Sequence, residues 1–462
     1  MDTKKLRQKI LDLAIRGKLV PQDPNDEPAS VLLERIRAEK EQLIKEGKIK
    51  RSKKSVASDT SHYENVPFEV PGNWCWATIG ELFQLQAGKF IEAPQISTCK
   101  DATHIYPCYG GNGLRGYVES YNRDGLFPII GRQGALCGNI NIAEGKFYAT
   151  EHAVVVETFA NIDIQLFVYF LIQLNLNQYA TATAQPGLAV KTINDVPIPL
   201  PPINEQHRIS MAIEKSLDTL SEIDQSKHAI RKSILQLKSR ILDLAISGKL
   251  AAQDCSDEPA LELLRRINPS YAPCDNRHYE NVQYPDSWEV VKMGEMVRII
   301  SGVAYSKSDV TISGIKVIRG GNIQAGEIIE CDDDVYIDNR YADPTNNIYK
   351  GDIVLVASTG SQQLIGKTGF ATRDYVQTQI GAFLRILRPK DIRCADFLNL
   401  FFQSDYYRQY IRSLAKGTNI NNVKNSYIED FVIGLPPLQE QNRIVAFTNK
   451  IFYMIDEILA GL

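Results

Sequence analysis

The chain repeats itself once, and this repeat constrains its fold more than any other feature. Residues 12–19 read DLAIRGKL and residues 243–250 read DLAISGKL, which differ at one position. Three further segments return in the same order: DEPA at 26–29 and 257–260, YENV at 63–66 and 279–282, and LPPINEQHRI at 200–209 as LPPLQEQNRI at 435–444. Because repeated segments mark equivalent structural positions, the sequence predicts two related units and a pseudo-two-fold symmetric molecule.

The most periodic stretch follows the first LPP segment and predicts a long helix. Its apolar residues recur mainly at alternating steps of three and four, the spacing of a coiled-coil seam. They are Leu217, Leu220, Ile223, Ile230, Ile234, Leu237, Ile241 and Leu244. A helix of ~45 residues spans roughly 65 Å, which is too long for one small domain. We expect it to end at Gly248, to separate two domains, and to bind a partner through Leu217, Leu220, Ile230, Ile234 and Leu237.

Both ends of the chain repeat parts of this helix. Phe452, Ile455 and Ile458 continue the seam near the C-terminus. Near the N-terminus, Leu6, Ile10 and Leu13 match Leu237, Ile241 and Leu244. A long apolar seam needs a partner helix. We therefore expect the two termini to meet and together form a second helix that packs antiparallel to the central one.

Between the helices, short apolar runs rich in β-branched residues predict strands, for example HAVVVE (152–157) and DIVLVAST (352–359). The expected fold class is α/β (α+β), with two strand-rich mixed domains separated by a long antiparallel two-helix coiled coil. The expected segments are an N-terminal helix (1–20), a helix and basic linker (21–60), the first strand-rich domain (61–202), the central helix (203–250), a linker (251–278), the second strand-rich domain (279–437) and a C-terminal helix (438–462).

The composition is ordinary for a soluble protein, with 44% hydrophobic and 23% charged residues. No apolar run approaches the ~18–20 residues of a membrane span, and the N-terminus lacks a signal-peptide core. We therefore expect a cytoplasmic protein. The eight cysteines form no CxxC pair and lie apart from the six histidines, which argues against zinc or a disulfide framework. A net charge of −3 does not indicate a nucleic-acid binder, yet one face can still be basic.

Motifs of catalysis are absent from the sequence. GSQQLIGKT (360–368) resembles a phosphate-binding loop, but five residues instead of four separate Gly360 and Gly366. Pro285-Asp286 is not followed by the acidic residue and lysine of a nuclease, and LPPI and LPPL are not the box of an amino-methyltransferase. There is no HExxH and no GxSxG. We expect no metal site and no catalytic residue in this chain.

Polar loops spaced by glycine are the remaining candidates for function. The first domain has YGGNGLRGY (109–117), IGRQGALCGNI (130–140) and TAQPGL (183–188), and the second has VIRGGNI (317–323), ASTGSQQLIGK (357–367) and KGTNINNVK (416–424). Each loop alone is compatible with an ordinary turn. Together, their arginine and amide side chains suit base edges, and their lysine and hydroxyl side chains suit phosphates. The candidate DNA contacts are Gly111, Asn112, Arg132, Gln133, Arg319, Asn322, Ser358, Ser361, Gln362, Lys367, Thr418, Asn419 and Asn421.

With these residues in view, the chain resembles the specificity subunit of type I restriction–modification systems over almost its full length. The resemblance is carried by LDLAIxGKL at 11–19 and 242–250, the paired LPPxxEQxRI segments, the YGGNGLRGY run and KGTNINNVK. The first domain departs from the usual pattern, because QPGLAVKTIND stands where the second has GTNINNVKNSYIED.

The resemblance implies two target-recognition domains that read an asymmetric bipartite site on double-stranded DNA. It also implies two methyltransferase subunits and restriction/translocase subunits as partners, in a system of phage defence. S-adenosylmethionine, ATP and Mg²⁺ would then act in those partners, and this chain would need no cofactor. A duplicated coiled-coil scaffold without DNA readout is the alternative from another class of function, and a nuclease ranks last.

Overall fold

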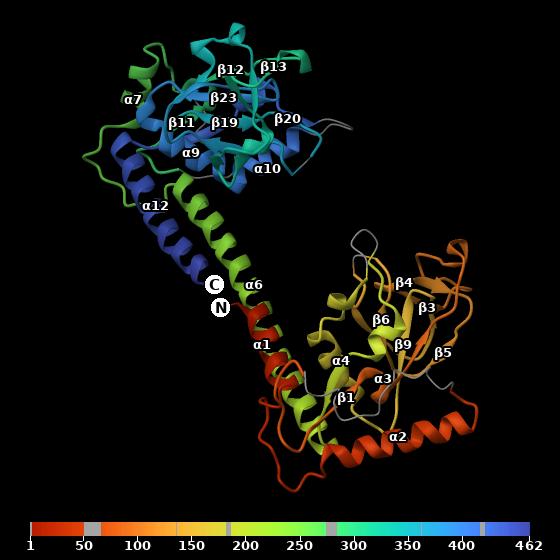
Figure 1. Ribbon diagram of the computed structural model, residues 1–462. Helices are drawn as coiled ribbons and strands as arrows, with labels where there is room; N and C mark the ends of the chain where they lie inside the picture. Colours follow the sequence, from red (N-terminus) through yellow and green to blue (C-terminus); the bar gives the residue numbers. More distant parts are fainter. Residues whose placement is uncertain are drawn as a thin grey trace. The chain divides into compact units, whose positions relative to one another are not determined.

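The computed structural model describes residues 2–49, 66–134, 136–181, 186–273, 284–361, 363–415 and 421–462. Outside the described residues lie most of the first YENV segment, all of the second, and most of the basic run at 48–54. Gln362, Thr418 and Asn419 also lie outside them. The chain divides into two compact units, Met1–Ser226 and Lys227–Leu462. Helix α6 (Ile203–Ile246) continues from the first unit into the second, and in the chain it follows one strand-rich domain and precedes the other (Figure 1).

The first unit combines helices with three small sheets. Its helices are α1 (Thr3–Ile15), α2 (Ala29–Lys45), α3 (Ile79–Leu82), α4 (Ile164–Gln173) and α5 (Val190–Asn194). Its strands are β1 (Cys75–Thr78), β2 (Phe83–Ala87), β3 (Tyr106–Gly110), β4 (Gly113–Val118), β5 (Arg123–Asp124), β6 (Phe127–Gly131), β7 (Ile140–Ala143), β8 (Lys146–Ala149), β9 (Ala153–Thr158) and β10 (Pro197–Leu200). The strand orders are β2-β9-β6-β7, β4-β3-β8-β5 and β1-β10.

Strand β9 explains the continuous apolar run AVVV (153–156) inside HAVVVE. Val154 and Val156 belong to the core cluster that includes Phe167 of α4, whereas Ala153 and Val155 belong to a second cluster, on the other face of the strand. Successive strand residues point to opposite faces of a sheet. Since both faces of β9 are buried, every position in the run has to be apolar.

The second unit repeats this plan with larger sheets. Its helices are α7 (Ala260–Ile267), α8 (Met293–Met296), α9 (Ala395–Gln403), α10 (Asp405–Leu414), α11 (Asn425–Glu429) and α12 (Leu438–Gly461). Its strands are β11 (Glu289–Lys292), β12 (Val297–Ser301), β13 (Val310–Thr311), β14 (Ile315–Ile318), β15 (Ile323–Gln324), β16 (Glu327–Ile328), β17 (Val335–Ile337), β18 (Asn347–Ile348), β19 (Ile353–Val356), β20 (Ser358–Thr359), β21 (Thr368–Phe370), β22 (Tyr375–Ile380), β23 (Leu384–Pro389), β24 (Asn421–Asn422) and β25 (Val432–Leu435).

Two main sheets form the second domain, in the orders β12-β23-β19-β21-β16-β15 and β13-β17-β14-β22-β18. Strand β19 alternates as β9 does: Ile353 and Leu355 pack in the cluster that contains α9, and Val354 joins the other face. A short pair closes each domain in the same register, because Cys75 of β1 lies opposite Leu200 and Glu289 of β11 lies opposite Leu435. The predicted pair of related α+β domains is therefore confirmed.

In each unit, a terminal helix packs antiparallel against its own part of α6. Asp2 caps α1 by accepting from two backbone N–H groups, and Thr3 Oγ1 donates to Asp224 Oδ1 at 2.8 Å. In the second unit, Lys238 Nζ lies 2.6 Å from Asp456 of α12, and Ile455 of α12 packs in one cluster with Ile234 and Ile241. The predicted seam thus receives partner helices from within the chain.

This packing corrects part of the predicted partner surface. Leu220 and Ile234 are buried at 6% and 9% exposure, and Leu217 is half-buried against the first core. Leu220 and Ile234 are already covered by the chain itself, so they are not open to another subunit. Ile230 and Leu237, by contrast, stay 44% and 47% exposed. The meeting of the two termini stays a prediction.

Candidate nucleic-acid interface

The repeated segments meet in a buried polar joint at the start of α6. Glu205, in the first turn of the helix, has no exposed surface. Its carboxylate accepts one hydrogen bond from Trp74 Nε1 at 2.9 Å and another from Gln22 Nε2 at 2.6 Å. Burial raises the pKa of Glu205, and the two donors act in the opposite direction. A buried carboxylate with two good donors fixes the geometry of the groups around it.

The second unit contains the same joint, residue for residue, although both donors there bind one carboxylate oxygen. Trp288 Nε1 donates to Glu440 at 2.9 Å, and Gln253 Nε2 donates to the same carboxylate at 2.7 Å. Arg443 forms a bidentate ion pair with Asp257 of the repeated DEPA segment, with a closest approach of 2.6 Å. In the first unit the equivalent pair, between Arg208 and Asp26, also has two contacts.

The glycine of each GKL segment is required by the same joint. Gly17 has φ +66°, and a side-chain carbon there would lie 2.5 Å from the ring of Pro71. Gly248 has φ +72° and would meet Pro285 at the same distance. Only glycine combines the left-handed conformation with this close approach. Together, these contacts explain why the segments recur: they fix each domain to its helix.

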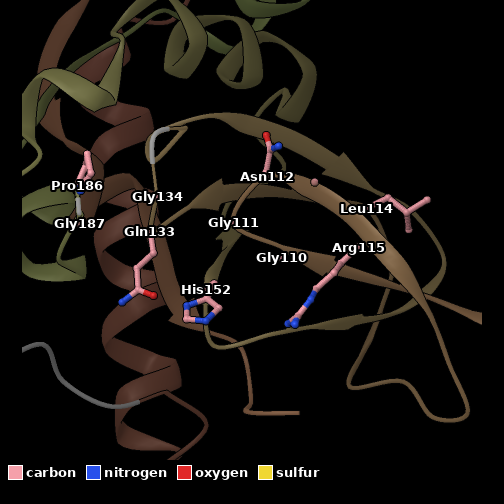
Figure 2. Close-up of a pocket in the computed structure, with 11 residues that line it drawn as sticks. Gly110, Gly111, Asn112, Leu114, Arg115, Gln133, Gly134, His152, Pro186 and Gly187 are labelled. Carbon is pink, nitrogen blue, oxygen red and sulfur yellow. The ribbon is translucent and has the colours of Figure 1, made fainter. Parts of the chain in front are cut away.

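Three polar loops of the first domain and the turn at His152 surround a cavity of about 600 Å³. It is lined by Gly110, Gly111, Asn112, Gly113, Leu114, Arg115, Gln133, Gly134, His152, Pro186 and Gly187 (Figure 2). Backbone hydrogen bonds hold the loops together, because Gly134 N donates to Pro186 O and Arg132 N donates to His152 O. The three polar loops predicted from the sequence are thus brought to one place.

Glycines let these loops approach each other. A side-chain carbon on Gly131 would lie 1.9 Å from the carbonyl oxygen of Gly111. No other residue fits there without moving the backbone of one loop. The cavity therefore depends on bare backbone at its base, while its rim carries polar side chains.

The rim of the cavity offers hydrogen-bonding groups that the protein leaves unused. Asn112, Arg115 and Gln133 are exposed, and none of their side chains contacts a hydrogen-bonding partner in the part of the chain that the structure describes. His152, whose Nε2 lies 3.0 Å from Glu151, is drawn between Gln133 and Arg115 in Figure 2. An amide, a guanidinium and a second amide in one hollow are suited to base edges.

Of the predicted residues in the first domain, Gly111, Asn112 and Gln133 line the cavity. Arg132 does not; its backbone joins the loops instead, by donating to His152 and accepting from Leu188. Arg115 stands inside the YGGNGLRGY run but was not among the residues predicted from the sequence.

In the second domain, two predicted residues are already engaged. Asn322 is 1% exposed, and its amide bonds to the Ile329 carbonyl and to Asp334. Arg319 donates to the Asp333 side chain at 2.7 Å. This placement argues against Asn322 as a base reader, since its hydrogen-bonding groups are used and covered. Asn322 instead stabilises the turn that starts at Arg319, whose N–H it accepts.

The other described candidates of the second domain lie around one turn. Strand β20 pairs with β24, which brings Ser358 opposite Asn422 and Thr359 opposite Asn421. The turn that follows is closed by backbone bonds from Ile365 N to Ser361 O and from Gly366 N to Val356 O. Lys367 follows this turn, and its side chain is half-buried.

The comparison with known families decides what this arrangement is. The sequence model of the family described as "Type I restriction modification DNA specificity domain" matches residues 71–234 and 285–462. The chain belongs to this family. It is a type I specificity subunit, the non-catalytic component.

Individual relatives agree with the family match. The chain is 26% identical over 538 aligned residues to the type I restriction enzyme EcoAI specificity subunit of Escherichia coli, covering 98% of this chain and 90% of that protein. It is 42% identical to the Escherichia coli EcoprrI specificity subunit over 36% of this chain and 41% of that protein. A solved chain from a study of assembly and conformational transition of the type I R-M system aligns at a TM-score of 0.54 and 17% identity, over 86% of this chain and 94% of that chain.

The two family matches begin at the joint. They start at residues 71 and 285, which are the prolines that pack against Gly17 and Gly248. One copy of the family domain therefore comprises a strand-rich domain and the helix that follows it. The described residues contain no group of His, Cys, Asp and Glu that could hold a metal ion, and no described helix is long and apolar enough to cross a membrane.

Proposed function

We propose that the chain binds double-stranded DNA as the specificity subunit of a type I restriction–modification complex and reads an asymmetric bipartite target. The observation that carries this proposal is the pair of equivalent joints that hold two different recognition surfaces. Identical joints give each domain the same attachment, while the loops between the repeated segments differ. Two different surfaces read two different half-sites.

In the first domain, the rim of the cavity is the reading surface. Arginine pairs with guanine, and asparagine or glutamine pairs with adenine, through two hydrogen bonds in the major groove. Arg115, Asn112 and Gln133 supply these groups without first breaking a bond inside the protein. In the second domain, Ser361 and Lys367 lie around the turn after β20, and Gln362, Thr418 and Asn419 remain predicted contacts on the basis of sequence.

The chemistry belongs to partner subunits under this proposal. Two methyltransferase subunits dock on the helical part and methylate adenine N6 with S-adenosylmethionine, after each target base is extruded from the stack. Restriction subunits add ATP- and Mg²⁺-dependent translocation and cleavage. The exposed apolar side chains Ile230 and Leu237 suit the docking of a methyltransferase. Helix α6 connects the two domains and sets the length of the unread spacer between the half-sites, because half-site spacing follows protein geometry.

The test is target selection by the complete complex. The chain and its methyltransferase partner are incubated with a pool of random duplexes, and the retained DNA is sequenced. Two short blocks separated by an unread spacer are the expected result. The variant N112A/Q133A should relax the first block and leave the second unchanged, at a cost of ~1–3 kcal/mol per lost base contact. The second block is thus the internal control.

A duplicated scaffold without DNA readout makes the opposite prediction. In that case the complex would retain all duplexes equally, or none, and N112A/Q133A would change nothing. Retention of a single uninterrupted block would contradict the bipartite reading but not DNA binding.

A further inference from the structure

Helix α10 carries two arginines, Arg408 and Arg412, that are not among the residues predicted from the sequence. Arg408 and Arg412 are four residues apart, so they lie on the same face of the helix. Both use Nη2 to donate to the backbone carbonyl of Gln363, at 3.2 and 3.1 Å. Gln363 belongs to the turn after β20, beside Ser361 and Lys367. The two guanidinium groups therefore converge on the edge of the second reading surface.

This pair of arginines has no carboxylate within ion-pair distance among the described residues. Other arginines of the same unit lie beside carboxylates: Arg388 is 2.7 Å from Asp352 and Arg393 is 2.6 Å from Asp391. Neither Arg408 nor Arg412 forms an ion pair with any residue that the structure describes. Burial and the charge of Arg412 lower the pKa of Arg408, against smaller opposing effects of Tyr407 and Asp405. The Nε groups of both arginines are buried and lack a hydrogen-bond partner among the described residues.

Such an arrangement is costly in the protein alone. Like charges at this spacing on a helix repel one another, and partial burial of a guanidinium without a counter-charge adds a desolvation cost. A single carbonyl oxygen carries only a partial negative charge. An anion shared by the two forks would offset both costs, since guanidinium and phosphate form bidentate, charge-assisted hydrogen bonds.

We propose that Arg408 and Arg412 form a phosphate clamp that holds the DNA backbone beside the reading turn of the second domain. This inference rests on the proposed function. The clamp positions the duplex and reads no base, because phosphates are the same at every sequence. It belongs to the second domain alone, since a single turn of 3-10 helix (Leu176–Tyr179) follows α4 in the first domain, where α10 follows α9 in the second.

The experiment measures how DNA binding depends on salt. The full chain, in complex with its methyltransferase, is titrated with a duplex that carries the bipartite target and with a scrambled duplex of equal length. The slope of log K against log salt is negative, and each lost phosphate contact reduces its magnitude by about 0.9. Below, a lower slope means a smaller magnitude. R408A/R412A should therefore lower the slope by about 2 on both duplexes and leave the ratio of the two affinities unchanged.

Two further variants separate charge from fold. R408K/R412K keeps both charges and should keep most of the slope. R393A removes an arginine that is already neutralised by Asp391, so its slope should equal that of the wild type. If the double alanine variant does not fold, the single variants R408A and R412A replace it, and each should lower the slope by about 1.

Three outcomes would overturn the clamp. An unchanged slope in the folded alanine variants would show that the pair only holds the Gln363 carbonyl. A loss confined to the target duplex would mean that the pair reads bases. In the third outcome, inorganic phosphate at constant ionic strength stabilises the wild type but not the variant, and the salt slope of DNA binding is the same for both. That result would assign the pair to a free phosphate. A wild type that binds both duplexes equally would instead contradict the proposed function, whatever the slope of the variants.

Discussion

The joint at Glu440 predicts a large and pH-dependent cost for a conservative change, Trp288→Phe. The substitution removes one hydrogen-bond donor and keeps an aromatic ring between Tyr284 and Phe397, which the tryptophan contacts with centroids 5.8 and 6.0 Å away. Trp288 and Glu440 are 6% and 1% exposed, so water cannot replace the lost indole N–H.

The magnitude follows from the two parts of the change. A hydrogen bond to a charged acceptor contributes about 1.5–3 kcal/mol, and its loss leaves Glu440 with Gln253 as its remaining side-chain donor. The smaller ring loses about 1 kcal/mol of burial. The sum, about 3 kcal/mol, corresponds to a fall of about 6–12 °C in the melting temperature of a unit of this size.

Thermal and urea unfolding of the full chain measure this cost. Trp76→Phe is the matched control, because Trp76 packs against Phe68 and its indole N–H has no partner among the described residues. Trp74→Phe is the repeat-equivalent variant and should destabilise the first unit by a similar amount. The Trp288 bond lowers the pKa of Glu440. The cost of Trp288→Phe should therefore be fully present above that pKa and shrink as the carboxyl becomes protonated at lower pH.

A cost for Trp288→Phe no larger than that for Trp76→Phe would refute this reasoning. So would a cost that is the same at pH 4 and pH 7, since a mere packing defect does not titrate.

The Glu440 carboxyl, the loops of the first domain and the two termini give three further predictions. Burial raises the pKa of Glu440 above its ordinary 4.5, so the folded state binds the carboxyl proton more tightly than the unfolded state. The stability that this group contributes therefore falls as the pH rises from 4.5 through the pKa of the folded state. The unfolding free energy of the wild type minus that of E440Q should fall from pH 4 upward, and a difference that does not change with pH would contradict this. Gly131→Ala forces the first loops apart and should abolish selection of the first half-site while the second is kept, as judged by sequencing of retained duplexes. Cysteines placed at Thr3 and Leu459 should crosslink if the termini meet, and failure to crosslink under mild oxidation would contradict that arrangement.

Much of the fold follows from local patterns in the sequence. The seam of α6 and the apolar runs of β9 and β19 are periodic, so their helical or strand character is readable without knowledge of the rest. Spacing alone did not show which seam residues stay exposed. Leu220 and Leu237 both belong to the predicted seam, yet Leu220 is buried and Leu237 stays exposed.

Candidate site residues were predictable from the sequence only where a glycine-rich loop also leaves its polar side chains exposed. The polar loops of the first domain were identified from the sequence, and the structure brings them together with Asn112 and Gln133 at the cavity. Asn322 has the same residue type in a similar glycine-rich run, but tertiary contacts bury its amide.

The joint and the arginine pair were missed for another reason. Trp288 and Glu440 are far apart in the sequence, and only their recurrence in both copies could have indicated a shared role. Arg408 and Arg412 resemble an ordinary solvated helix face until the turn at Gln363 is placed against them.

The most direct test of the account is an adenine-methylation map, by long-read sequencing, of cells with and without this gene and with its methyltransferase partner present. The account predicts one interrupted, asymmetric motif that is methylated with the gene and unmethylated without it. An unchanged map, with the methyltransferase shown to be active, would contradict a role for this chain in choosing the target.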